Sequence, residues 1–92
     1  GWLLIGRQVP TAFGKFIDLL AIDAEGQLIV IELKKNRTPR EVVAQLLDYG
    51  SWVRNLEDDE IATIFEAFVN KYHPEHKATS LDEAFCERFK VE

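Results

Sequence analysis

Two strand-like segments joined by a three-residue loop constrain the fold of this chain more than any other feature. Residues 16–23 and 28–34 are rich in β-branched and large apolar side chains, and the loop Ala24–Glu25–Gly26 ends on a glycine suited to a left-handed backbone conformation. This pattern predicts an antiparallel β-hairpin. In the register that the loop sets, Ile22 faces Leu28 and Leu20 faces Val30.

The same register places two carboxylates opposite each other. Asp18 faces Glu32, and Lys34 follows on the same face, opposite Phe16. Facing like charges destabilise a sheet by up to about 1 kcal/mol, so a cation bound between them would offset the repulsion. Hard oxygen ligands suit a divalent ion such as Mg²⁺, and a water bound to such an ion is easier to deprotonate. The alternative is an exposed strand face with one salt bridge.

Other segments predict the elements around the hairpin. Trp2–Ile5 is a short strand, and residues 6–10 are irregular. Thr38–Pro39–Arg40–Glu41 has the form of a helix capping box, so a helix is expected over residues 38–56. Gly50 inside this helix lowers its intrinsic stability, which indicates close packing at that position.

The remainder, residues 57–92, is expected to be helical. One helix begins at the acidic residues 58–60 and ends at Pro74, and another begins at Ser80. The chain is therefore predicted to be one α/β domain, with a mainly antiparallel three-stranded sheet backed by helices. Residues 1–56 would form a catalytic hairpin and helix, and residues 57–92 a helical extension.

Composition narrows the class of protein. The 92 residues include no Met, which indicates an excerpt of a longer protein, and no apolar run approaches the ~20 residues needed to span a membrane. A single cysteine, Cys86, cannot form an internal disulfide, so a reducing, cytoplasmic location is expected.

Charge is unevenly distributed along the chain. The net charge of −5 argues against a nucleic-acid partner. However, residues 1–55 are slightly basic, and four of their cations, Lys34, Lys35, Arg37 and Arg40, lie close together after the hairpin. This cluster either contacts phosphates or is a solvated charge run at a loop.

The order of these motifs resembles the PD-(D/E)xK nuclease superfamily, in which a strand Asp, a Glu-x-Lys and a helical Gln-x-x-x-Tyr recur. A nearer resemblance is to the catalytic domain of the NucS-like (EndoMS-like) DNA endonucleases and their uncharacterised bacterial relatives. It covers nearly the whole chain and rests on the segments 6–8, 17–20, 31–35, 45–49, 80–85 and 88–89.

The resemblance implies a restriction-endonuclease-like fold and a Mg²⁺- or Mn²⁺-dependent DNA endonuclease. Asp18, Glu32 and the Leu33 backbone carbonyl would hold the metal ion, and Lys34 would be the catalytic lysine. The residues that would contact DNA or orient the site are Arg7, Gln8, Lys35, Arg37, Gln45 and Tyr49, with Arg7 and Gln8 near the scissile phosphate. Taken without the resemblance, Gln45 and Tyr49 mark a boundary between core and surface.

Two features of the superfamily are not recognisable here: a helix before the first strand, often with an acidic residue, and a strand after the Gln-x-x-x-Tyr helix. Both are expected to lie outside the excerpt, which leaves open whether the chain is active by itself. The alternative function is a non-catalytic, nuclease-like DNA-binding or assembly module. Because an open sheet edge invites pairing with another copy, a homodimer is also expected.

Overall fold

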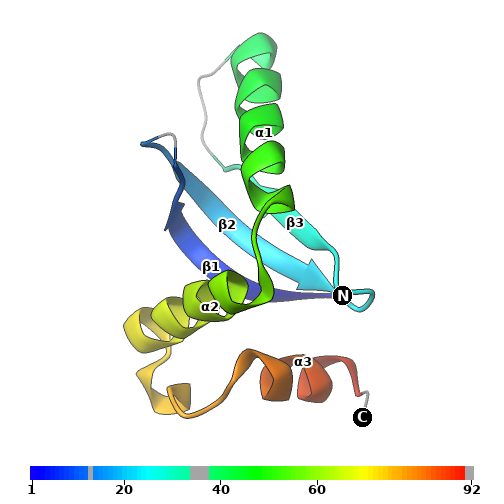
Figure 1. Ribbon diagram of the computed structural model, residues 1–92, viewed down its shortest axis with the longest axis vertical. Helices are drawn as coiled ribbons and strands as arrows, with labels where there is room; N and C mark the ends of the chain where they lie inside the picture. Colours follow the sequence, from blue (N-terminus) through cyan, green and yellow to red (C-terminus); the bar gives the residue numbers. More distant parts are fainter. Residues whose placement is uncertain (13, 34–37, 91–92) are drawn as a thin grey trace.

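The computed structural model describes residues 1–12, 14–33 and 38–90 and contains a three-stranded antiparallel sheet in the order β1-β2-β3. Figure 1 shows the strands and helices, which are β1 (Trp2–Pro10), β2 (Phe16–Asp23), β3 (Leu28–Ile31), α1 (Pro39–Arg54), α2 (Asp58–Tyr72), the short 3₁₀ helix η1 (Pro74–His76) and α3 (Leu81–Phe89). The predicted sheet and its helical cover are confirmed. Within the described ranges, no helix is long and apolar enough to cross a membrane.

The hairpin forms in the predicted register, with Leu20 paired to Val30 and Ile22 to Leu28. Gly26 closes the loop at φ 80°, in the left-handed region. However, β3 ends at Ile31, so the prediction of a strand reaching residue 34 is wrong. The Leu33 N–H donates to the Asp18 side chain instead of extending the backbone ladder. Lys34 lies outside the described residues.

Strand β1 is longer than predicted. It runs from Trp2 to Pro10, so the assignment of residues 6–10 as irregular is wrong. The glycine and the proline suggest a loop, but β1 is an edge strand, where a residue without an N–H is tolerated at the strand end. The irregularity is instead a bulge: Leu4 pairs with Ala21 and Gly6 with Leu20, which leaves Ile5 as the extra residue.

Gly6 allows α2 to approach the sheet closely. Helix α2 crosses β1 (Figure 1), and a Cβ atom on Gly6 would lie 2.6 Å from Val9 Cγ2 and 3.1 Å from Ile64 Cγ2. Both distances are shorter than ordinary van der Waals contacts. The contact completes a single core of buried side chains from the sheet, α1 and α2, which are Ile5, Val9, Ile17, Leu20, Ile22, Tyr49, Val53, Phe65, Phe68 and Val69.

The helices begin where the capping signals predict. Thr38 and Glu41 form the expected capping box at α1, and Ser80 and Glu83 form one at α3. Helix α2 begins at Asp58 and ends at Tyr72, two residues before Pro74. In each case a side chain satisfies backbone N–H groups of the first turn that have no partner within the helix.

Helix α1 buries apolar side chains such as Val53 near its C-terminal end but not near its N-terminal end. Its N-terminal turns extend beyond the sheet (Figure 1), and Val43, Leu46 and Leu47 are exposed, Leu47 to 70%. The buried side chains of its middle turns are Gln45 and Tyr49 instead. The helix therefore presents a polar pair to the sheet and an apolar patch, Val43, Leu46 and Leu47, to solvent.

The two glycines allow a matched stability test. Gly50 lies inside α1, and a Cβ there meets nothing within 4 Å, so the prediction of close packing at Gly50 is wrong. Gly50→Ala should raise the free energy of unfolding by about 0.5–1 kcal/mol through helix propensity. Gly6→Ala should lower it by about 1–3 kcal/mol through overpacking. Urea denaturation measures both changes. If Gly50→Ala lowered the free energy of unfolding, it would contradict the conclusion that a Cβ at position 50 meets no neighbouring atom.

Candidate active site

Asp18 lies at the centre of the candidate site. It is on the central strand β2, its side chain is only 6% exposed, and both neighbouring strand segments hold its carboxylate. Oδ2 accepts a hydrogen bond from the Leu33 N–H at 2.8 Å, and Oδ1 accepts one from Gln8 Nε2 at 3.2 Å. Hydrogen bonds to an ionised group are stronger than neutral ones, so they orient this carboxylate.

Glu32 follows β3 directly. The last pair of the ladder joins Leu19 to Ile31, and one further step of that register brings Glu32 opposite Asp18. Both carboxylate oxygens of Glu32 are shielded from solvent. Burying an ionised carboxylate costs several kcal/mol unless its surroundings compensate the charge. Two carboxylates therefore meet at the end of the hairpin, where water access is restricted.

Gln45 and Tyr49 connect α1 to the start of β2. Gln45 Nε2 donates to Tyr49 Oη, and that hydroxyl donates to the Phe16 backbone carbonyl at 3.0 Å. Both side chains are buried, Tyr49 completely, so the prediction of a boundary between core and surface is wrong for this pair. Because Phe16 precedes Asp18 by two residues on the same strand, the pair holds α1 against the segment that carries Asp18.

A hollow of about 610 Å³ opens beside Asp18. It brings together residues from the sheet and from the end of α2, which are Leu4, Arg7, Gln8, Asp18, Leu19, Leu33, Phe68, Tyr72 and His73. Arg7 and Gln8 come from β1, and Tyr72 and His73 from the end of α2. Nothing in the sequence marks Tyr72 or His73 for this site, because no local spacing links them to Asp18, which is more than fifty positions away.

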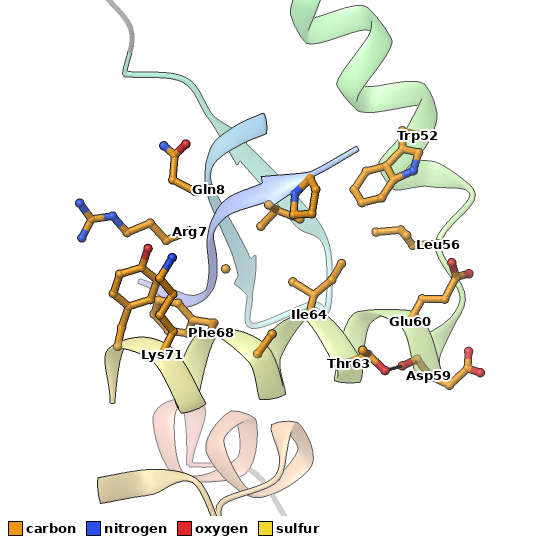
Figure 2. A pocket seen from close by; sticks show the side chains of 15 residues that line it. Arg7, Gln8, Trp52, Leu56, Asp59, Glu60, Thr63, Ile64, Phe68 and Lys71 are labelled. Carbon is orange, nitrogen blue, oxygen red and sulfur yellow. Dashed lines mark hydrogen bonds between the residues drawn. The ribbon is translucent and has the colours of Figure 1, made fainter. Parts of the chain in front are cut away.

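A second, mainly apolar groove of about 480 Å³ shares Arg7, Gln8, Phe68 and Tyr72 with the hollow. Figure 2 shows it between β1, the end of α1 and α2, with Trp52 and Leu56 on one side and Ile64 and Phe68 below. The groove ends on charged side chains. Arg7 and Gln8 therefore stand between two cavities.

The chain matches the family model described as the endonuclease NucS C-terminal domain over residues 1–84. It belongs to this family. No solved structure matches the chain. The match covers β1 to β3, α1, α2, η1 and the first turn of α3, so it spans every residue of the candidate site.

The donor set of this NucS-family domain suits a hard divalent ion. Its described residues contain no group of three or more His, Cys, Asp or Glu side chains arranged to hold a metal. The two carboxylates, Asp18 and Glu32, are nevertheless the ligand type that Mg²⁺ prefers, and Mg²⁺ retains several waters. A carboxylate has about four lone-pair positions, so the hydrogen bonds that Asp18 accepts from Gln8 and Leu33 do not by themselves prevent it from binding an ion.

Three of the residues expected to act at the site, Lys34, Lys35 and Arg37, lie outside the described residues. Arg40, in the first turn of α1, is exposed. The structure thus brings Arg7, Gln8, Asp18 and Leu33 to one hollow, with Glu32 adjacent in the chain to Leu33.

Two substitutions of Asp18 separate its shape from its charge. Asp18→Asn retains an oxygen for the Leu33 N–H, and the exposed Gln8 amide can turn to accept from the new NH₂ group. We expect a change of less than about 1 kcal/mol in the free energy of unfolding. Asp18→Ala leaves the Leu33 N–H without its partner and should cost about 2 kcal/mol. Metal-free urea denaturation tests this; equal losses in the two variants would contradict it.

Proposed function

We propose that this domain is a divalent-metal-dependent endodeoxyribonuclease of the PD-(D/E)xK type. The observation that carries the proposal is the position of Asp18, oriented at the edge of an open hollow by Gln8 and by the backbone of Leu33. The solvent-shielded Glu32 carboxylate lies one residue before Leu33. This arrangement concentrates negative charge where a cation would bridge the chain and a phosphate.

In this proposal, Asp18, Glu32 and the Leu33 carbonyl hold Mg²⁺ or Mn²⁺. When bound, the ion would lower the pKa of a coordinated water and stabilise charge on the phosphate. Gln8 keeps the Asp18 carboxylate in one orientation, because its amide donates to Oδ1. Lys34 positions the attacking water or neutralises the phosphate charge that develops during the reaction.

DNA is the proposed substrate. Although the net charge is −5, Arg7 lines the Asp18 hollow, and the cluster Lys34, Lys35, Arg37 and Arg40 follows the hairpin directly in the sequence. Cations at such positions contact the phosphate backbone, which orients a duplex independently of its sequence. Gln45 and Tyr49 act on the site by holding α1 against the Phe16 carbonyl.

A cleavage assay tests the enzymatic proposal. The natural full-length protein should cut DNA in Mn²⁺, and Asp18→Asn and Glu32→Gln should abolish cleavage. Lys34→Ala should slow the reaction by about 10²-fold or more, as loss of one preorganised donor does elsewhere, with little change in DNA affinity. Asp48→Asn, an exposed carboxylate on α1, is the matched control and should cut normally. Cleavage by Asp18→Asn at the wild-type rate would refute the proposal.

The second candidate is a non-catalytic DNA-binding or assembly module with the same fold. The exposed apolar patch of α1 (Val43, Leu46 and Leu47) favours it, because such a patch is typical of a contact surface. Under this alternative the full-length protein binds DNA without cutting it. Asp18→Asn then leaves the DNA affinity unchanged, and neither protein cleaves DNA.

The same patch supports the proposal that the chain forms a homodimer. Two-fold pairing is the commonest symmetry and would bury at least ~1,000 Å² in total. Leu47→Glu should convert the dimer into a monomer in light scattering, whereas Asn70→Glu, an exposed position on α2, should not. A wild-type chain that remains monomeric at high concentration would contradict the proposal.

A further inference from the structure

The C-terminal end of α2 gathers cations beside the Asp18 hollow. The Arg7 guanidinium carbon lies 5.1 Å from the centre of the Tyr72 ring, and Lys71 Nζ lies 5.4 Å from the same centre. Both distances are within the ~6 Å range of a cation–π interaction. Two positive charges, one from β1 and one from α2, therefore lie near one aromatic ring.

The Tyr72 ring is itself held in place. Tyr72 is half-buried, and its ring centre lies 5.7 Å from that of Phe68, a core residue. Phe68 also contacts the His73 ring, with 5.3 Å between the two centres. The ring thus provides a fixed surface for the guanidinium of Arg7, whose side chain is exposed.

The charges of α2 are separated along its length. Its first turn contains Asp58, Asp59 and Glu60, and Lys71 is the basic residue of its last turn. Figure 2 shows Arg7, Gln8 and Lys71 at one end of the groove and Asp59 and Glu60 at the other. A cation in the last turn is favourable for the helix dipole, but that alone does not account for a second cation on the same ring.

Two cations that share one ring repel each other, and a bound anion would offset the repulsion. The hollow that Arg7 and Tyr72 line also contains Asp18. If the proposed function holds, the scissile phosphodiester lies at Asp18, and the anion at this position would be a neighbouring phosphate of the same nucleic acid.

We propose that Arg7, Lys71 and Tyr72 form a phosphate shelf where the Asp18 hollow meets the apolar groove; Arg7 and Tyr72 line both cavities, and Lys71 lines the groove. Arg7 and Lys71 contact backbone phosphates of the DNA, and Tyr72 is a positioning residue that holds the Arg7 guanidinium. The proposal rests on the proposed function, because it assigns a DNA contact to the same site. Since phosphates have no base identity, the shelf should act equally on all sequences.

A double-mutant cycle tests the role of Tyr72. Binding of a fluorescein-labelled DNA duplex to the full-length protein is measured by anisotropy in metal-free buffer. Arg7→Ala and Tyr72→Leu should each weaken binding several-fold. Because Tyr72 acts through Arg7, the double variant should bind no more weakly than Arg7→Ala alone. Tyr72→Phe retains the ring and should bind like the wild type.

Lys71 has a matched control in Lys77, an exposed lysine in the segment after α2. Lys71→Ala should weaken binding several-fold on every duplex sequence and lower the slope of log Kd against log salt by about 1, the effect of one lost phosphate contact. Lys77→Ala should change neither quantity. Equal effects of the two substitutions would overturn the assignment of Lys71.

Other outcomes would overturn the role of Tyr72. If the effects of Arg7→Ala and Tyr72→Leu multiply in the double variant, Tyr72 does not act through Arg7. Thermal unfolding checks that each variant is folded. If Tyr72→Leu does not fold, Tyr72→Met takes its place in the cycle, because it keeps a long apolar side chain without a ring.

The experiments can reject the phosphate-shelf proposal and the enzymatic proposal independently of each other. If the wild type binds DNA and the cycle behaves as expected but no cleavage occurs in Mn²⁺, the shelf is supported and the enzymatic proposal fails. If the wild type cuts DNA and the Arg7, Tyr72 and Lys71 variants bind and cut normally, the shelf is refuted and the enzymatic proposal remains. A wild type that cuts DNA in Mn²⁺ but does not bind it in metal-free buffer refutes the shelf alone. A wild type that neither binds DNA nor cuts it overturns both.

Discussion

The hydrogen bonds of one buried carboxylate connect the three strands of this domain. Asp18 is on the central strand, and it accepts from Gln8 on β1 and from Leu33 just after β3. The bond to Leu33 ends the backbone ladder between β2 and β3, so the chain after Ile31 departs from the sheet at the carboxylate. The polar interaction that orients Asp18 therefore also determines where β3 ends, and Glu32 is the first residue after that end.

The close approach of α2 to the sheet determines what surrounds this carboxylate. Gly6 has no side chain, so Ile64 can pack near the β1 backbone. This contact sets the position of α2, and its last turn then lies beside Arg7, which immediately follows Gly6. A residue without a Cβ thus brings Tyr72 and Lys71, which are distant in sequence, to the place where the hollow meets the groove.

Helix α1 is attached to the sheet by a buried polar pair and leaves apolar side chains in solvent. Gln45 and Tyr49 form a chain of hydrogen bonds to Phe16, and burial makes each of those bonds costly to lose. The observed arrangement connects α1 to the strand that carries Asp18, which suits a helix that supports a site.

The sequence by itself determined the local features of the fold. Loop chemistry at Gly26 set the hairpin register, and the capping residues Thr38 and Ser80 set the starts of two helices, because these signals act over a few neighbouring residues. The tertiary structure decided the length of β1, the end of β3 and the face that α1 buries. It alone brought Tyr72 to Arg7, since that contact depends on how α2 packs across β1 and no local pattern in the chain encodes that packing.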